Sequence, residues 1–354
     1  MEQKKVYVEL MRIFASLAVI TIHVTAGAIQ DYKEGSFDWI FAVVCNSLSR
    51  WCIPLFFMIS GGVLLDRKQP ITVKQILNRN VFRLVKVLIV WGIPYYFFDL
   101  WKNGQTVSIK KIVLLPFAIF SGQTGYHLWY LYVLVLIYLF VPLLKSWVYI
   151  VGRRMIEYAV CLFFVCTLVI GFYNSIILRI GMPEILQINF VMTDLQGYMG
   201  SFLVGYYLSH YEVPDIVKRW IYIISGVGVV IVPVGNILIS TIKKEYMAPL
   251  SDYNGLFSVV IAAGIYIHMR NKEEELRGNS KRSRRIINLG KNTFGIYILH
   301  VFFTGLVFHK FSPDISAIPA VILLPVCVAI VFAVSAVLTA ALKRLQKVSR
   351  LIGL

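Results

Sequence analysis

The sequence has few charged residues and no organised set of cysteines. Only 15% of its 354 residues are charged, whereas a soluble globular domain averages about 25%. Its five cysteines lie in apolar runs, form no Cys-x-x-Cys pair and do not cluster with histidine. We interpret them as small packing residues and expect no bound metal. These absences argue against a disordered chain and against a secreted disulfide scaffold.

Apolar residues are correspondingly abundant and make up 58% of the chain. A membrane helix needs about 20 mostly apolar residues. Runs of this length predict an all-α integral membrane protein. Residues 1–354 are expected to form a single transmembrane domain, a bundle of about ten helices. The run 110–121 is too short to span and is expected at the interface or as a re-entrant segment. The ten expected spans are 7–29, 37–65, 82–101, 127–145, 156–178, 187–209, 220–241, 252–269, 292–311 and 318–342.

The positive charges predict the orientation of these spans. With the N-terminus in the cytoplasm, segments facing the cytoplasm carry 25 Lys and Arg residues and those facing outward carry 8. By the positive-inside rule, both the N- and C-termini are expected to be cytoplasmic. The net charge of +17 is then spread over short loops that face lipid headgroups. We therefore expect membrane lipids as partners of this charge, and no nucleic acid.

Arg12 and His23 lie within the first span, where an ionisable residue is by default a functional candidate. They are eleven residues apart, which is close to three helical turns, so they share one face about 16 Å apart along the axis. Ser16 and Val19 between them are small and leave room for an elongated ligand. Alternatively, Arg12 pairs with Glu9 or extends to the headgroups, and His23 hydrogen-bonds a neighbouring helix.

Arg50 lies near the middle of the second span. Pro54, four residues later, has no N–H for the Arg50 carbonyl, so the helix is expected to kink or break there. One interpretation makes Arg50 an anion or carbonyl ligand in a central cavity. The other makes it a structural arginine paired with a carboxylate of another helix.

Further polar residues are expected near the outer surface. His127 opens the fourth span among aromatic residues typical of an interfacial belt, and we retain it as a second polar group near His23. Asp194 and Asp252 lie in the outer thirds of their spans. Each can orient an imidazole or bind a sugar hydroxyl, and simple solvation explains them equally well. For His300, in the ninth span, a helix-packing hydrogen bond is the favoured role.

Arg79, Arg83 and Lys86 have helical spacing where the third span begins. This pattern is typical of basic residues that anchor a helix at the cytoplasmic surface. It equally fits a phosphate site for a bulky anionic cosubstrate.

The order of these residues resembles that of the acyltransferase-3 membrane family. Arg12, ten intervening residues and His23 match its Arg-x10-His signature, and Arg79 to Arg83 resembles its basic entry to the third helix. The likeness spans nearly the whole chain and is closest to the branch that O-acylates surface polysaccharides. Four further segments resemble blocks of the family: Ser49–Gly61, His127–Tyr132, Phe202–Leu208 and Asn292–His300.

The resemblance implies a ten-helix acyltransferase of the bacterial inner or plasma membrane, without an additional domain. It implies acetyl-CoA, or another acyl-CoA, as a cosubstrate that arrives from the cytosol, and no bound cofactor. The implied acceptor is a hydroxyl of a cell-surface or lipid-linked glycan. By their match to the signature, Arg12 and His23 are the implied essential pair.

These residues fit a mechanism of acyl transfer. His23 would be the base for the attacking hydroxyl or a transiently acylated relay. Arg12 would bind the phosphates or pantetheine of the donor, Arg79 and Arg83 its nucleotide end, and Arg50 would support the cavity or polarise the thioester. The main alternative is a transporter or exporter of a polar or acylated glycan, because transporters also carry polar residues in broken helices. Consumption of acetyl-CoA distinguishes the two.

Overall fold

The computed structural model describes residues 5–66, 71–171, 173–174, 194–278, 280–315 and 318–353. Every regular element within these ranges is helical, which confirms the predicted all-α fold class. A helix satisfies its own backbone hydrogen bonds, as a segment in lipid requires. The elements are α1 (Val6–Asp31), α2 (Phe37–Ser47), α3 (Cys52–Leu64), α4 (Val73–Ile76), η1 (Leu77–Val81), α5 (Phe82–Lys102), α6 (Ile109–Phe120), η2 (Tyr126–Leu128), α7 (Trp129–Ile150), α8 (Arg153–Phe163), η3 (Phe164–Val169), α10 (Asp194–His210), α11 (Asp215–Lys243), η5 (Pro249–Ser251), α12 (Leu256–Asn271), α13 (Glu273–Gly278), α14 (Ser280–Gly290), α15 (Thr293–Ile315), α16 (Ala320–Arg344) and α17 (Gln346–Ile352).

Seven helical stretches of the described chain are long and apolar enough to cross a membrane, and they coincide with seven of the ten expected spans. The expected spans 156–178 and 187–209 extend into residues outside the described ranges, and Thr293–Leu306 forms a shorter apolar helix. A count of ten spans and the cytoplasmic placement of both termini therefore stay predictions. The seven are Val6–Asp31, Phe37–Leu64, Val73–Lys102, Tyr126–Ile150, Asp215–Lys243, Pro249–Asn271 and Ala320–Arg344.

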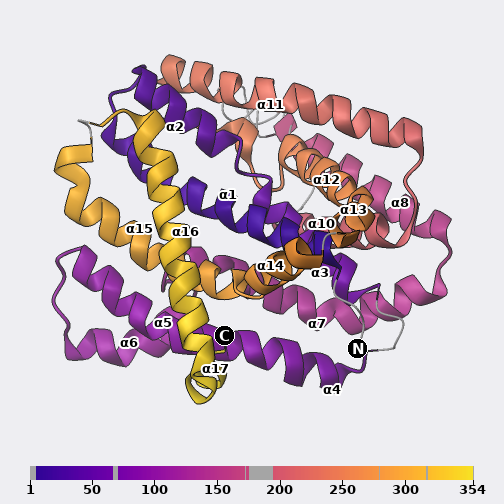
Figure 1. Cartoon of the computed structure of the whole chain (residues 1–354), viewed down its shortest axis with the longest axis horizontal. Helices are drawn as coiled ribbons and strands as arrows, with labels where there is room; N and C mark the ends of the chain where they lie inside the picture. The colour runs from indigo at the N-terminus through magenta and orange to yellow at the C-terminus, as the bar shows by residue number, and fades with distance from the viewer. Residues whose placement is uncertain are drawn as a thin grey trace.

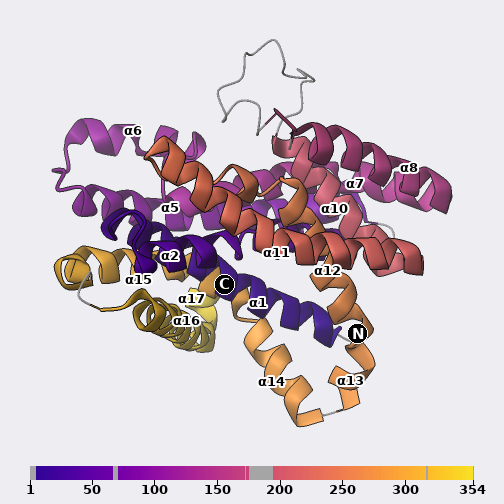
Figure 2. The same cartoon turned by 90° about the horizontal axis from the view of Figure 1, so that it is seen from above.

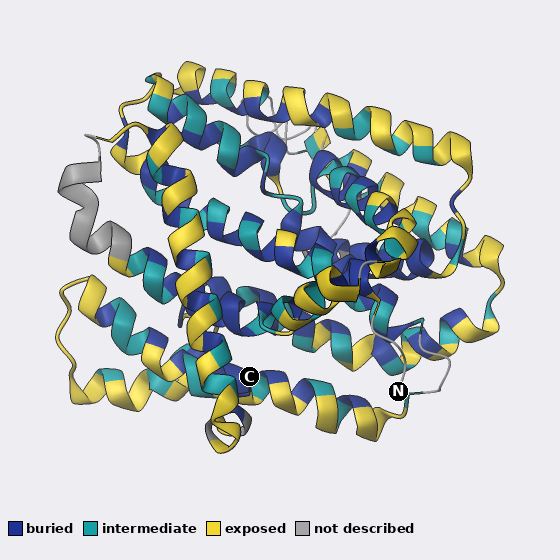
Figure 3. Cartoon of the chain, in the orientation of Figure 1, coloured by how far each residue is buried: buried dark blue, intermediate teal, exposed yellow. Residues whose placement is uncertain are grey.

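Helix α1 runs through the middle of the bundle, with α11 along one side and α4 and α5 along the opposite side (Figure 1). It packs against α2, α3, α12, α14, α15 and α16. Buried residues concentrate on α1 and α3, whereas α11 exposes much of its length (Figure 3). The exposed positions of α11 are largely apolar, as expected of a helix that faces lipid.

The cysteines differ in how far they are buried. Cys52 and Cys327 are buried, as the packing interpretation predicts, but Cys161 is exposed on α8.

The second span is broken in the middle, as Pro54 predicts. Helix α2 ends at Ser47 and α3 begins at Cys52, which makes Pro54 the third residue of α3. A proline is tolerated in the first turn of a helix, where its missing N–H has no intrahelical partner to lose. Arg50 therefore lies in a non-helical step between two half-helices.

Close packing of α3 against α10 fixes the half-helix that follows this break. A Cβ added at Gly61 would come within 1.8 Å of the Phe202 carbonyl oxygen, and one at Gly205 within 1.9 Å of the Met58 carbonyl oxygen. Only glycine permits this approach, which is the usual way in which membrane helices gain packing energy. The backbone of α3 is thus held in place where it faces the centre of the bundle.

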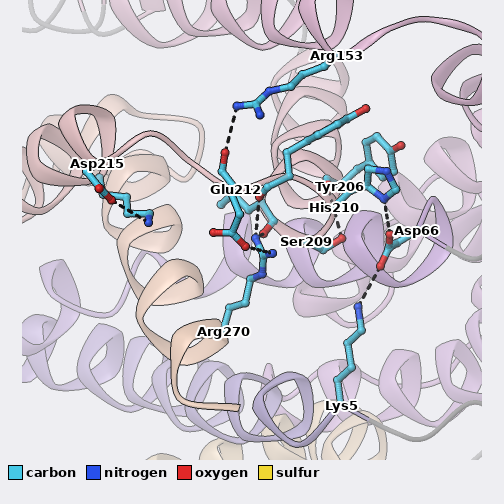
Figure 4. A network of polar contacts seen from close by, with 12 residues as sticks. Lys5, Asp66, Arg153, Tyr206, Ser209, His210, Glu212, Asp215 and Arg270 are labelled. Carbon is cyan, nitrogen blue, oxygen red and sulfur yellow. Dashed lines mark hydrogen bonds and ion pairs between the residues drawn. The ribbon is translucent and has the colours of Figure 1, made fainter. Parts of the chain in front are cut away.

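Ion pairs join the residue before α1 to the ends of α3 and α10, and the end of α12 to the segment after α10 (Figure 4). Asp66 accepts from Lys5 at 2.9 Å and from His210 at 2.7 Å. Glu212 accepts from Arg270 at 2.7 Å. The short helices α13 and α14 lie beside this end of α1, at one edge of the bundle (Figure 2).

A side chain of α13 caps the first turn of α1. Glu273, the first residue of α13, accepts the backbone N–H groups of Val6 and Tyr7 at 3.1 and 2.8 Å. A carboxylate at a helix N-terminus satisfies free N–H groups and complements the helix dipole. These contacts fix the N-terminal end of α1 and so the position of Arg12, about one and a half turns further along.

Candidate active site

A cavity of about 600 Å³, here called the cationic pocket, opens beside the N-terminal half of α1. It brings together three predicted site residues, Arg12 from α1, Arg79 from η1 and Arg83 from α5. Two more cations line it that the sequence analysis did not single out, Lys291 just before α15 and Lys343 near the end of α16. Basic residues outnumber acidic ones in this lining, so the cavity favours an anion.

Arg12 is held by a neighbour on its own helix. Its Nη1 atom lies 3.1 Å from Oε1 of Glu9, and the Glu9 side chain is 4% exposed against 32% for Arg12. The pairing with Glu9 that sequence offered as an alternative is therefore present, yet Arg12 still lines the cavity. A guanidinium has five N–H donors, so a pair that engages one of them leaves others for a ligand.

A short π-helix precedes Arg83 and carries Arg79 at the same cavity. Residues Leu77–Val81 form η1 between α4 and α5, and such wider turns are frequent at functional sites. Arg83 donates from Nε and Nη2 to the carbonyl of Gly353 at 3.3 and 3.2 Å, and its guanidinium lies 5.4 Å from the ring centre of Phe294. The segment after α17 and the start of α15 thus orient Arg83.

The N-terminus of α15 forms another part of the pocket wall. Asn292, Thr293 and Phe294 line the cavity, and the N–H of Ile296 makes the bond to the Asn292 carbonyl that opens the helix. The earlier N–H groups have no partner within α15, and they carry the positive end of its dipole. Lys343 donates to the Lys291 carbonyl and to Oδ1 of Asn292, the latter at 3.3 Å. Cations and a helix N-terminus together form an anion site.

A second group of residues that line the pocket is apolar or aromatic. Ile53 and Phe56 come from α3, Leu134 from α7, and the largely buried rings of Tyr130 and Tyr297 also line the cavity. The cationic pocket therefore offers both charged and apolar side chains. This combination suits a ligand with an anionic part and an uncharged arm.

Tyr297 connects the pocket to a group of three histidines. Its ring centre lies 5.6 Å from that of His127 and 5.9 Å from that of His300. The ring of His23 lies 5.2 Å from that of His300, and the rings of His127 and His300 are 5.4 Å apart. We call His23, His127 and His300 the histidine cluster.

Two rings of the histidine cluster are buried and the third is partly accessible. His127 is 2% exposed and His300 is fully buried, whereas His23 is only half-buried. The ring of His23 also contacts Tyr126, whose side chain is 55% exposed, at a centroid distance of 5.1 Å. His23 is thus the member of the cluster with access to the surroundings.

A backbone carbonyl fixes the orientation of the His300 ring. His300 Nδ1 lies 2.6 Å from the carbonyl oxygen of Tyr297, and the Tyr297 hydroxyl donates to the carbonyl of His127. Among the described residues, neither ring nitrogen of His127 has a hydrogen-bond partner, and Nε2 of His300 has none. The bond of His300 is to Tyr297, one turn earlier on the same helix α15, and it engages only one of the two ring nitrogens. The helix-packing hydrogen bond favoured for His300 from the sequence therefore stays a prediction.

Arg50 lies in neither group. Its Nε donates to Oδ1 of Asn46 at 3.0 Å and its guanidinium stacks 4.9 Å from the ring centre of Tyr253. The amide of Asn46 donates in turn to the carbonyl of Ile22 and to Oγ1 of Thr25, at 3.2 and 2.9 Å. Asn46 therefore joins Arg50 to the stretch of α1 that carries His23, a link that residue spacing does not reveal. In the described chain no carboxylate pairs with Arg50.

Of the two aspartates considered from the sequence, only Asp252 has a described side chain, and it does not contact His23. Asp252 is exposed, and its Oδ1 accepts the N–H of Asn254 at 2.8 Å within a turn. The side chain of Asp194 lies outside the described residues. Within the described ranges there is no group of three or more His, Cys, Asp or Glu side chains that could hold a metal ion.

Comparison with known families identifies the class to which this arrangement belongs. Residues 5–340 match the sequence model of the acyltransferase-3 family, described as an acyltransferase domain. The chain belongs to this family. The match covers the cationic pocket almost completely and all of the histidine cluster, and it supports a membrane acyltransferase. No curated protein and no solved structure matches the chain.

Proposed function

We propose that the protein transfers an acyl group, in the first instance acetyl, from cytosolic acetyl-CoA to a hydroxyl of a cell-surface or lipid-linked glycan. The observation that carries this proposal is the position of the cationic pocket directly beside the histidine cluster, with Tyr297 shared by both. Membership of the acyltransferase-3 family supports the reaction class over a transporter or exporter. The protein would reside in the bacterial inner or plasma membrane.

The cationic pocket fits the chemistry of a coenzyme A thioester. The phosphates of the donor would bind Arg79, Arg83 and the first N–H groups of α15, since charge-assisted bonds to phosphate are among the strongest available to a protein. Arg12, on α1, would bind the remaining phosphate charge or the pantetheine amides. The apolar lining would hold the pantetheine arm and direct the thioester toward Tyr297 and the histidines.

His23 would supply the base. The acceptor hydroxyl attacks the thioester carbonyl, its proton passes to His23, and collapse of the tetrahedral intermediate breaks the C–S bond. The proton then neutralises the departing thiolate, so that the net products are the ester and free coenzyme A. In the relay form, His23 itself attacks the thioester and later passes the acyl group to the hydroxyl. His127 and Arg50 would bind the acceptor or support the cavity around it.

A purified full-length preparation in lipid nanodiscs tests the proposal against the transporter alternative. Acetyl-CoA should bind, and addition of cell-envelope glycan from cells lacking the protein should release free thiol in step with glycan acetylation. Trapping of acetylated His23 in the absence of glycan would select the relay form. Binding without any release of thiol, or transport of glycan without consumption of acetyl-CoA, would contradict the proposal.

A further inference from the structure

Acyl transfer by a histidine base usually requires a third group that orients the imidazole and fixes its tautomer. A carboxylate commonly takes this role. In the part of the chain that the structure describes, no carboxylate contacts His23, and Asp252 is exposed and engaged in its own turn. The ring beside His23 that carries a free acceptor is another imidazole, that of His300.

The bond between His300 and Tyr297 settles the chemistry of the second nitrogen of His300. A carbonyl oxygen can only accept, so Nδ1 of His300 must carry the proton that it donates to Tyr297. In the neutral ring, Nε2 is then an acceptor. This nitrogen is buried, and no partner for it exists among the described residues. An unsatisfied buried acceptor is costly unless a donor reaches it.

His23 is placed to be that donor. The centres of the two rings are 5.2 Å apart and their planes are inclined by 35°. This separation fits an N–H···N bond between two imidazoles once a nitrogen of each ring is turned toward the other. The ring of His127 is the other imidazole neighbour of His300, at 5.4 Å and 82°. Of the two, His23 has the shorter separation and is the ring whose orientation matters for the proposed base.

We propose that His300 is a positioning residue whose Nε2 accepts the N–H of His23 and so leaves the other nitrogen of His23 free for the acceptor hydroxyl. This inference rests on the proposed function of His23 as the base. When His23 takes the hydroxyl proton, its bond to His300 becomes charge-assisted and strengthens. The Tyr297 carbonyl holds His300 in the required tautomer, and Tyr297 also lines the cationic pocket. Tyr297 thus contributes both to the proposed donor pocket and to the orientation of the base.

Two replacements of His300 separate this role from a structural one. His300→Gln places an amide oxygen, an acceptor, near the position of Nε2 but loses the donor at Nδ1. His300→Asn keeps a donor near the position of Nδ1, for the Tyr297 carbonyl, but has no group at the position of Nε2. A positioning role predicts that Gln is the more active variant, whereas a purely structural bond to Tyr297 predicts that Asn is.

The measurement is the steady-state rate of thiol release from acetyl-CoA with cell-envelope glycan as acceptor. We expect His300→Gln to keep kcat within about tenfold of the unmodified protein and His300→Asn to lose about a hundredfold, with the KM for acetyl-CoA unchanged in both. The exposed His268 at the end of α12 provides a control, since His268→Gln should change neither constant. Equal losses in both variants, or a more active His300→Asn, would overturn the proposal.

A second readout does not depend on the acceptor. Diethyl pyrocarbonate modifies neutral imidazole nitrogens, and peptide mass spectrometry measures its rate at His23 in the folded protein. Loss of the orienting acceptor should slow modification of His23 about tenfold in His300→Asn but not in His300→Gln. An unchanged rate in both variants refutes the role of His300 while leaving His23 as the base. Retention of acetyl transfer by His23→Ala would instead refute the proposed function itself.

Discussion

The cationic pocket and the histidine cluster are neighbours that differ in charge and in access to water. The pocket gathers charged side chains that keep contact with water, and its charges come from five separate elements or their connections. The cluster gathers imidazole rings in the interior, and a backbone carbonyl orients one of them, that of His300. Charged side chains that keep contact with water avoid the cost of burial, whereas proton transfer benefits from a dry and preorganised site. The contrast predicts that binding and chemistry can be separated by mutation.

Replacement of His23 should have the largest effect and should fall on chemistry alone. His23→Ala removes the base, so we expect kcat for acetyl transfer to fall at least about a thousandfold. The dissociation constant of acetyl-CoA should stay within about twofold, because His23 does not line the cationic pocket. Calorimetry and thiol release on the same preparation measure the two quantities. A large loss of donor affinity would show that the two regions are not separable.

The arginines of the pocket should show the reverse pattern. Arg79→Ala and Arg83→Ala each remove a cation from the proposed phosphate site. We expect each to cost about 1.5–3 kcal/mol of binding free energy, or roughly 10- to 100-fold in acetyl-CoA affinity. At saturating acetyl-CoA, kcat should change less than threefold. Arg83→Lys should recover only part of the loss, because a single ammonium does not reproduce the paired bonds to Gly353.

Sensitivity of this affinity to salt gives an independent check on the same residues. Partly exposed charges are screened, so acetyl-CoA affinity should fall as ionic strength rises, and less steeply in Arg79→Ala than in the unmodified protein. Equal salt dependence in the two proteins would remove Arg79 from the binding site.

The smallest effect is expected at a lysine of the pocket. Lys291 is an exposed single ammonium and cannot make the paired bonds to phosphate that a guanidinium makes, so Lys291→Ala should weaken acetyl-CoA binding only about two- to fivefold. Lys281 is a matched control, because it is an exposed lysine of α14 that does not line the cavity. If Lys281→Ala weakens binding as much as Lys291→Ala, the effect is that of general charge and not of the site.

Residue spacing predicted those parts of the molecule that depend on one helix at a time. Apolar runs located seven spans, Pro54 located the break between α2 and α3, and helical spacing grouped Arg79 with Arg83. These features follow from local backbone chemistry. Arg12 also reached the predicted pocket, because its position on α1 is fixed by the helix itself.

The remaining parts depend on how helices rotate and pack against one another. Lys343 reaches the N-terminus of α15 from the far end of α16, and no periodicity within either helix indicates that contact. A helix-packing hydrogen bond was the favoured role of His300, and only the packing of α15 against α1 brings its ring to His23. Asn46 is similar, since its role depends on the approach of α2 to α1.

The most direct test of the account is mass spectrometry of cell-envelope glycans from cells that carry the unmodified protein, His23→Ala or no protein. Isotopically labelled acetate, which cells convert to acetyl-CoA, would mark the transferred group. We predict labelled O-acetyl groups on a glycan only with the unmodified protein, although His23→Ala is present in the membrane in equal amount. The same labelled acetyl pattern in all three strains would contradict the central claim.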